Sequence, residues 1–126
     1  MTSSRIGMIP GTLASLLASA VLAAAGCHSY HIDTTVENRT GETIKLLEVD
    51  YPSASFGANQ LASGEAYPSQ IQLRGNGPLK VQYTAADGRL VQIDGPVLAE
   101  RQEGRLSIVL EPSGRAEFHP QLAPAN

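Results

Sequence analysis

Cys27 is the residue whose chemistry is easiest to define, because it is the only cysteine of the chain and follows small apolar residues in VLAAAGCHSY (21–30). A single cysteine can form neither an intramolecular disulfide nor a cysteine-based zinc site. A catalytic thiol would need a nearby base or cationic surroundings that lower its pKa. His28 is adjacent in sequence, but adjacency does not supply that geometry. These arguments weigh against a disulfide, a cysteine-based zinc site and a catalytic thiol at Cys27.

The segment before Cys27 has the layout of a secretory signal peptide. A polar start carries Arg5, an uncharged apolar run extends over 13–25, and Gly26 follows. This apolar run is shorter than the roughly 20 residues that a membrane span needs. Residues 1–26 are therefore predicted to be a signal helix that is removed. A plain signal peptide cleaved nearby and a membrane-spanning N-terminal helix are the alternatives.

The sequence AAGC, ending at Cys27, resembles the lipobox of bacterial lipoproteins, although Ala24 stands where that family prefers leucine. The resemblance implies cleavage between Gly26 and Cys27, a diacylglyceryl group on the Cys27 sulfur and acylation of the new amino group. Two or three acyl chains suffice for stable anchoring. In such lipoproteins an aspartate after the cysteine favours retention at the inner membrane. His28 occupies that position here, so the resemblance favours the outer membrane, on its periplasmic or surface face.

The three histidines of the chain are candidate metal ligands or catalytic bases. His28 and His31 are three residues apart but lack a set of cysteines or carboxylates that would complete a metal site. His119 stands alone near the C-terminus, and the serines have no nucleophile frame such as Gly-x-Ser-x-Gly. We therefore expect no metal, no cofactor, no catalytic residue and no enzymatic activity. A small envelope enzyme with a site near His119 is the alternative.

Half of the aromatic residues after position 26 lie in one stretch, DYPSASFGANQLASGEAYP (50–68). Tyr51, Phe56 and Tyr67 are the candidate binding residues there. One interpretation is a long connection whose aromatics contact a partner or form a platform for carbohydrate. The favoured interpretation is that Tyr51 and Phe56 belong to the core of crossing strands joined by a turn at ASGE, since a domain without tryptophan needs its aromatics inside.

The elements that must position these residues are β-strands, because hydrophobic residues alternate with a period of two. No segment after residue 30 has a convincing amphipathic helix. A change of alternation at Leu46–Leu47 predicts a β-bulge. Asp87-Gly88 predicts a tight type I′ hairpin, and Pro68 predicts an edge strand or a strand that begins after it. The alternating runs are 32–36, 42–51, 70–73, 79–83, 89–93, 105–110 and 115–119.

Seven or eight short strands separated by turns predict an all-β fold, an antiparallel β-sandwich that is immunoglobulin-like in architecture. A small barrel is the alternative. The expected organisation is a signal peptide (1–26), a short tether (27–33), a sandwich domain (34–120) and a tail (121–126). Without its first 26 residues the chain has 8 basic and 12 acidic residues. A weakly acidic domain without a basic stripe argues against nucleic acid as a partner.

The stretches LLEVDYPSASFGANQL, GPLKVQYTAADGR and SIVLEPSGRAEFHPQL resemble small bacterial lipoproteins, acidobacterial proteins among them. This resemblance implies no activity. The leading hypothesis is a lipid-anchored cell-envelope module with a non-enzymatic binding or accessory role, held on the membrane through Cys27 and contacting an envelope protein. A carbohydrate-binding module is a further alternative.

Overall fold

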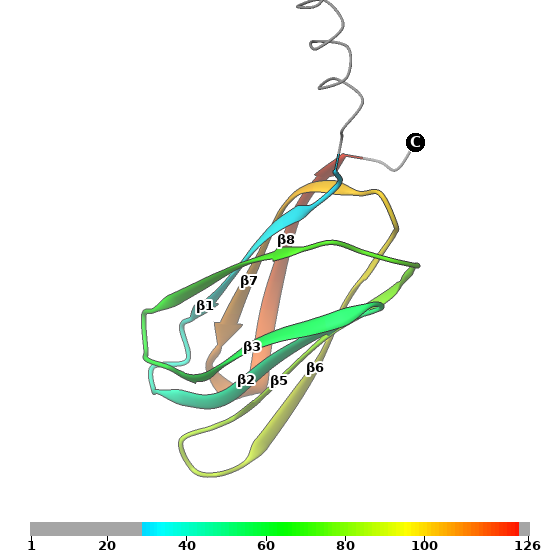
Figure 1. The fold of residues 1–126 in the computed structure, drawn as a ribbon. Helices are drawn as coiled ribbons and strands as arrows, with labels where there is room; N and C mark the ends of the chain where they lie inside the picture. The colour runs from blue at the N-terminus through cyan, green and yellow to red at the C-terminus, as the bar shows by residue number, and fades with distance from the viewer. Residues whose placement is uncertain (1–28, 124–126) are drawn as a thin grey trace, which may run out of the picture.

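The computed structural model describes residues 29–123, which form eight β-strands and one 3-10 turn (Figure 1). The alternation of apolar and polar residues accounts for the strands, since each one presents one face to the core. The elements are β1 (Ile32–Asn38), β2 (Ile44–Tyr51), β3 (Ala54–Leu61), β4 (Ala66–Ile71), β5 (Gly77–Thr84), β6 (Leu90–Leu98), β7 (Glu103–Glu111), η2 (Pro112–Gly114) and β8 (Arg115–Ala123).

The strands form two four-stranded sheets that pack as a sandwich. Sheet A has the order β4-β1-β7-β8, and sheet B has the order β3-β2-β5-β6. All neighbouring strands are antiparallel except β1 and β7, which are parallel. The predicted all-β sandwich is confirmed. The parallel pair was not predicted, because the alternation of side chains does not report strand direction.

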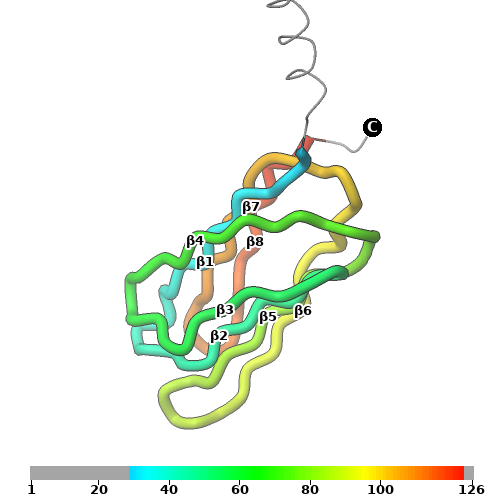
Figure 2. Tube along the Cα trace, viewed as in Figure 1, coloured from blue at the N-terminus to red at the C-terminus, as the bar shows by residue number. Residues whose placement is uncertain are grey.

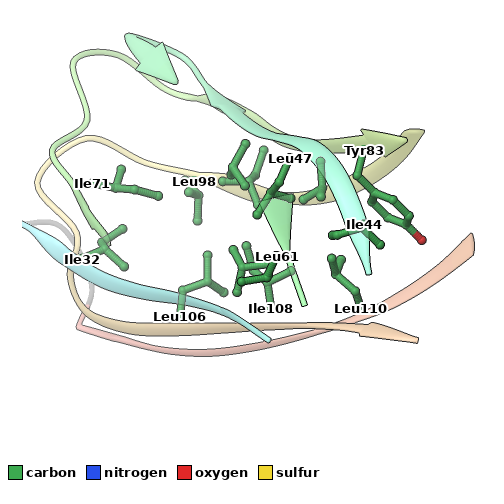
Figure 3. Packing of buried hydrophobic residues seen from close by; sticks show 14 of the residues in the cluster. Ile32, Ile44, Leu47, Leu61, Ile71, Tyr83, Leu98, Leu106, Ile108 and Leu110 are labelled. Atoms are coloured by element: carbon green, nitrogen blue, oxygen red, sulfur yellow. The ribbon is translucent and has the colours of Figure 1, made fainter. Parts of the chain in front are cut away.

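The core lies between the sheets and is built from one face of each strand (Figure 3). From sheet A come Ile32, Val36, Leu106, Ile108 and others, all fully buried. Sheet B adds a matching layer of aliphatic side chains and Tyr83. The buried core residues are Ile32, Val36, Ile44, Leu47, Val49, Leu61, Ile71, Leu73, Leu79, Val81, Tyr83, Val91, Leu98, Leu106, Ile108 and Leu110.

The predicted bulge in β2 is confirmed. The pairing of β2 with β5 shifts by one residue between Lys45 and Glu48. Leu46 adopts a positive φ of 53° and is 63% exposed, whereas Leu47 returns to the core. The extra residue changes which parity of β2 faces inward, so that Ile44, Leu47 and Val49 are all buried.

The hairpin between β5 and β6 is confirmed, but the predicted type I′ turn is wrong. The N–H of Gly88 donates to the carbonyl of Ala85, and the N–H of Ala85 donates to that of Arg89. Of the loop residues only Gly88 has a positive φ, whereas type I′ requires two such residues. The loop is a three-residue type I turn closed by a left-handed glycine, and Asp87 accepts a hydrogen bond from the Arg89 N–H.

The region 50–68 contains strands rather than one long connection. β3 occupies its centre, and residues 62–65 form the turn to β4. Pro68 lies within β4, which is one of the two edge strands of sheet A. This position agrees with one of the two predicted alternatives, an edge strand that contains Pro68. At the domain limits, β1 begins two residues before the expected start at 34, and β8 continues to Ala123, past the expected end at 120.

Asn38 is a fully buried polar residue that joins the two sheets at the end of β1. Its side-chain Nδ2 donates to the carbonyls of Glu42 (2.8 Å) and Leu61 (3.0 Å). Its Oδ1 accepts from the N–H (3.0 Å) and the hydroxyl (2.7 Å) of Thr40. Leu61 ends β3 in the opposite sheet, so one amide links sheet A to sheet B and shapes the β1–β2 turn.

The expected signal helix and Cys27 lie outside the described residues. Within 29–123, no helix is long and apolar enough to cross a membrane.

Replacing Asn38 with alanine should lower the free energy of unfolding by about 2–4 kcal/mol, because the substitution leaves buried carbonyl and N–H groups without partners. Asn38→Asp should also destabilise the fold, since a carboxylate would face the Glu42 and Leu61 carbonyls. Urea denaturation followed by circular dichroism measures both changes. The control is Asn59→Ala at an exposed asparagine, for which we expect a change below about 0.5 kcal/mol. Equal effects at positions 38 and 59 would contradict the assigned role of Asn38.

Candidate functional site

A hollow of about 610 Å³ lies along β3 beside the bulge of β2. We call it the β3 groove. Gly57 shapes it, because a Cβ atom at this position would collide with the carbonyl oxygen of Leu47. The absent side chain lets the backbone of β2 approach β3 closely at this point. The groove is lined by Leu46, Leu47, Glu48, Ser55, Phe56, Gly57, Ala58, Asn59 and Tyr67.

The three candidate aromatics meet at this side of the sandwich. The ring centroids of Tyr51 and Phe56 are 6.5 Å apart with planes tilted by 46°. Phe56 and Tyr67 are stacked, with centroids 6.1 Å apart and planes 13° apart. Because Phe56 belongs to sheet B and Tyr67 to sheet A, this stack bridges the two sheets. All three rings are half-buried and packed against the core.

This packing bears on the two interpretations of the aromatics. A flat carbohydrate platform presents its rings to solvent, whereas Tyr51, Phe56 and Tyr67 lean on the core. The arrangement favours a core role with partial exposure, and two of the rings, Phe56 and Tyr67, still form part of the wall of the β3 groove.

β3 is an edge strand without the features that usually protect such edges. A free edge presents unpaired N–H and C=O groups, and most proteins block it with charge or proline. The edge strand β4 contains Pro68, β6 contains Asp94 and Pro96, and β8 contains charged residues and Pro120. The β3 sequence ASFGANQL has neither a charge nor a proline. Among the four edges, β3 is thus the one open to pairing.

The outer face of sheet B beside the groove is polar and carries a pair of carboxylates. Glu48 and Asp50 are two residues apart on β2 and point to the same side. A hydrogen bond with Asp50 and its negative charge raise the pKa of Glu48 above its ordinary value. The Nε2 of Gln82 lies 3.5 Å from Glu48 Oε2, and Gln92 in turn donates to Gln82 (3.4 Å). The groove therefore has an acidic, hydrogen-bonding border.

His119 lies on β8, on the outer face of sheet A, far along the chain from the groove. Its Nε2 is 3.2 Å from Glu117 Oε2, and both side chains are about 60% exposed. Ser107 of β7 is its partner in register, but among the described residues the ring's hydrogen bond goes to Glu117. The hollow nearest along β8 is lined by Glu111 and Arg115–Glu117 and does not include His119.

The other sequence-predicted residues are placed as follows. His31 stands near Asp33, with 3.8 Å between Nε2 and Oδ1, and no group of three or more metal-ligating side chains occurs within 29–123. Gly26, Cys27 and His28 lie outside the described residues, so lipidation and cleavage stay predictions.

Comparison with known proteins defines the fold alone. No family model matches the chain, and no curated protein matches it. The chain is similar to the NMR structure of a protein from Eubacterium rectale, with a TM-score of 0.52 and 15% identity. The match covers 76% of this chain and 90% of that one. The chain thus has the sandwich fold of that protein.

Sequence analysis identified Phe56 and Tyr67 but missed the β3 groove around them. One signal was available, since ASFGANQL is the longest strand-compatible stretch without charge or proline after residue 50. The favoured interpretation placed Phe56 on a strand that ends before the turn at ASGE, but the apolar residues of the stretch do not alternate cleanly, so its position at a sheet edge could not be predicted.

Asp50→Asn should lower the pKa of Glu48 toward that of an isolated carboxyl, because it removes the adjacent negative charge. NMR titration of the Glu48 side chain measures this shift. In the unmodified protein the folded state holds this proton more tightly than the unfolded chain, so the pair should lower stability as pH rises through the window just above 4.5. Asp94→Asn, on the same face but two strands away, is the control and should leave Glu48 unchanged. An unaltered Glu48 titration in Asp50→Asn would contradict the pairing.

Proposed function

We propose that this protein is a lipid-anchored module of the cell envelope that binds another envelope protein through the β3 edge. The observation that supports this role best is the contrast among the four sheet edges, of which β3 alone lacks charge and proline. Pairing of an extended peptide with a free edge is a common mode of recognition. In that mode the main chain supplies affinity and neighbouring pockets supply specificity.

The β3 groove is suited to specificity in this mode. A strand added beside β3 would place alternate side chains over the groove, where Phe56 and Tyr67 offer ring surfaces and Glu48 offers a carboxylate. Gly57 has no side chain and that of Ser55 is small, so neither residue obstructs a strand added at this edge. A partner segment with apolar and basic side chains in alternation matches these surroundings.

Leu46 adds an apolar contact to the same site. It is one of the few large apolar side chains that are exposed, and it lines the groove. Its positive φ is strained for a leucine, and strain of this kind is concentrated at functional sites. We infer that Leu46 contacts the partner, because its side chain is exposed and contributes little to the core.

The proposed cellular location of the module is inferred from the N-terminal sequence. The lipobox-like AAGC supports acylation at Cys27, and His28 supports transport to the outer membrane, where the sandwich would face the periplasm or the surface. The short segment between Cys27 and β1 would keep the sandwich close to the membrane.

Cys27→Ser should release the protein from the membrane fraction, since the serine cannot receive the diacylglyceryl group. Fractionation of cells followed by mass spectrometry of the mature N-terminus measures this. Ser29→Ala, two residues further on, is the matched control and should stay in the membrane. A Cys27→Ser protein that fractionates like the natural one would refute the anchor.

A photo-crosslinking amino acid at Asn59, in the β3 groove, should give a discrete adduct with one protein in intact native cells. The same amino acid at Gln121 of the charged and proline-containing β8 edge is the control and should give none. Equal adducts at both positions, or none at Asn59, would argue against the β3 edge.

Leu46→Ala should reduce the Asn59 adduct by about five- to thirty-fold, the range expected for a contact worth about 1–2 kcal/mol. Leu90→Ala truncates a leucine of similar exposure on β6 and should leave the yield unchanged. Circular dichroism checks that both variants are folded.

A further inference from the structure

A second hollow, of about 250 Å³, lies at the end of the sandwich where the chain enters β1. We call it the entry hollow. It is lined by Ser29 and Tyr30, by Gln72–Arg74 of the β4–β5 loop and by Glu100 and Arg101 of the β6–β7 loop. At this end the start of β1 lies beside the end of β8, while the β5–β6 hairpin lies at the opposite end (Figure 2).

Covalent geometry fixes how far this hollow can lie from the proposed anchor. Tyr30 is three residues after Cys27, and three residues span at most about 10 Å. The polar headgroup layer is about 5–8 Å thick on each side of a bilayer. If Cys27 carries acyl chains in the hydrocarbon, Tyr30 and its neighbours must lie at or beside the headgroups.

The charges of the entry hollow differ from those of the rest of the domain. Its lining contains two arginines, Arg74 and Arg101, and one acidic residue, Glu100. The other described residues include six basic and eleven acidic side chains. An anionic surface would therefore repel most of the sandwich and attract the lining of the entry hollow, which orients the domain as well as holding it.

The loops that carry the arginines are held in place by hydrogen bonds. Asn76 Oδ1 accepts from the N–H of Glu100 at 2.7 Å, which ties the β4–β5 loop to the β6–β7 loop. Ser53 Oγ accepts from the N–H of Arg74 (3.2 Å) and donates to the carbonyl of Gln72 (3.3 Å). The two loop backbones are thus fixed before any ligand binds, which reduces the entropy lost on binding.

The side chains suit a phosphate at a membrane surface. A guanidinium group donates two parallel hydrogen bonds to phosphate oxygens. Tyrosine combines an apolar ring with a polar hydroxyl and is enriched at the headgroup level of membrane proteins, and Tyr30 is 37% exposed.

We propose that Arg74 and Arg101, with Tyr30 beside them, bind the phosphate of anionic lipid headgroups in the membrane that holds Cys27. The site rests on the proposed lipid anchor. It makes the entry end a second membrane contact and directs the opposite end, with the β5–β6 hairpin, away from the bilayer.

The test uses the acylated full-length protein in vesicles of phosphatidylcholine with or without phosphatidylglycerol. A polarity-sensitive fluorophore is attached to Gln72→Cys in the hollow or, as the control, to Ala86→Cys in the β5–β6 hairpin. The emission at position 72 should shift to the blue in phosphatidylglycerol vesicles, and the emission at position 86 should not shift. Arg74→Gln with Arg101→Gln should abolish the shift. Arg39→Gln with Arg89→Gln, at the opposite end, should retain it.

Four outcomes would overturn the site. Two of them are equal emission at positions 72 and 86 and a shift that persists in the Arg74→Gln, Arg101→Gln variant. A third is an equal response to inorganic phosphate added to phosphatidylcholine vesicles, which would indicate a site for free anions. In these three cases the acylated protein still floats with the vesicles, so the anchor stands. In the fourth, mass spectrometry finds no acyl chains on Cys27, and the anchor and the site fail together.

Discussion

The fold depends on how the two sheets are fastened together at the end of β1, and Asn38 provides that connection. A buried amide without partners would be costly, but every polar atom of this one has a partner. Its main chain is also used: the Asn38 N–H donates to the Glu65 carbonyl (2.9 Å), and the Asn38 carbonyl accepts from the Gly64 N–H (2.7 Å). The β1–β2 and β3–β4 turns are therefore fixed by one residue, and the end of β3 at Leu61 is fixed with them.

Beyond the contacts of Asn38, the two long sides of the sandwich are closed by different side chains. On the side of β6 and β8, Phe118 reaches so near to Gly95 that a Cβ there would lie 3.0 Å from its ring. On the side of β3 and β4, the stacked rings of Phe56 and Tyr67 close the sandwich. The first side is packed tightly, while the second leaves the β3 groove.

The sequence predicted those features that depend on one strand at a time. Alternation identified the inward residues of β1, β5 and β7, and the change of alternation at Leu46–Leu47 located the bulge. Features that depend on two strands escaped prediction. The parallel pairing of β1 with β7 joins segments about 70 residues apart, and no local pattern reports it. The hairpin turn was predicted wrongly because Asp-Gly fits two loop lengths.

The same distinction explains what could be foreseen of the candidate site. Phe56 and Tyr67 attract attention in a chain with few aromatics, yet their stacking requires knowledge that β3 and β4 belong to different sheets. The absence of charge in ASFGANQL is visible in the sequence, but it acquires meaning only once β3 is known to be an edge. The same composition in a central strand such as β2, which is paired on both sides, would leave no edge for a partner. Topology thus identifies this plain stretch as an edge strand without charge or proline, whereas the role predicted for Cys27 rests on the sequence alone and stays a prediction.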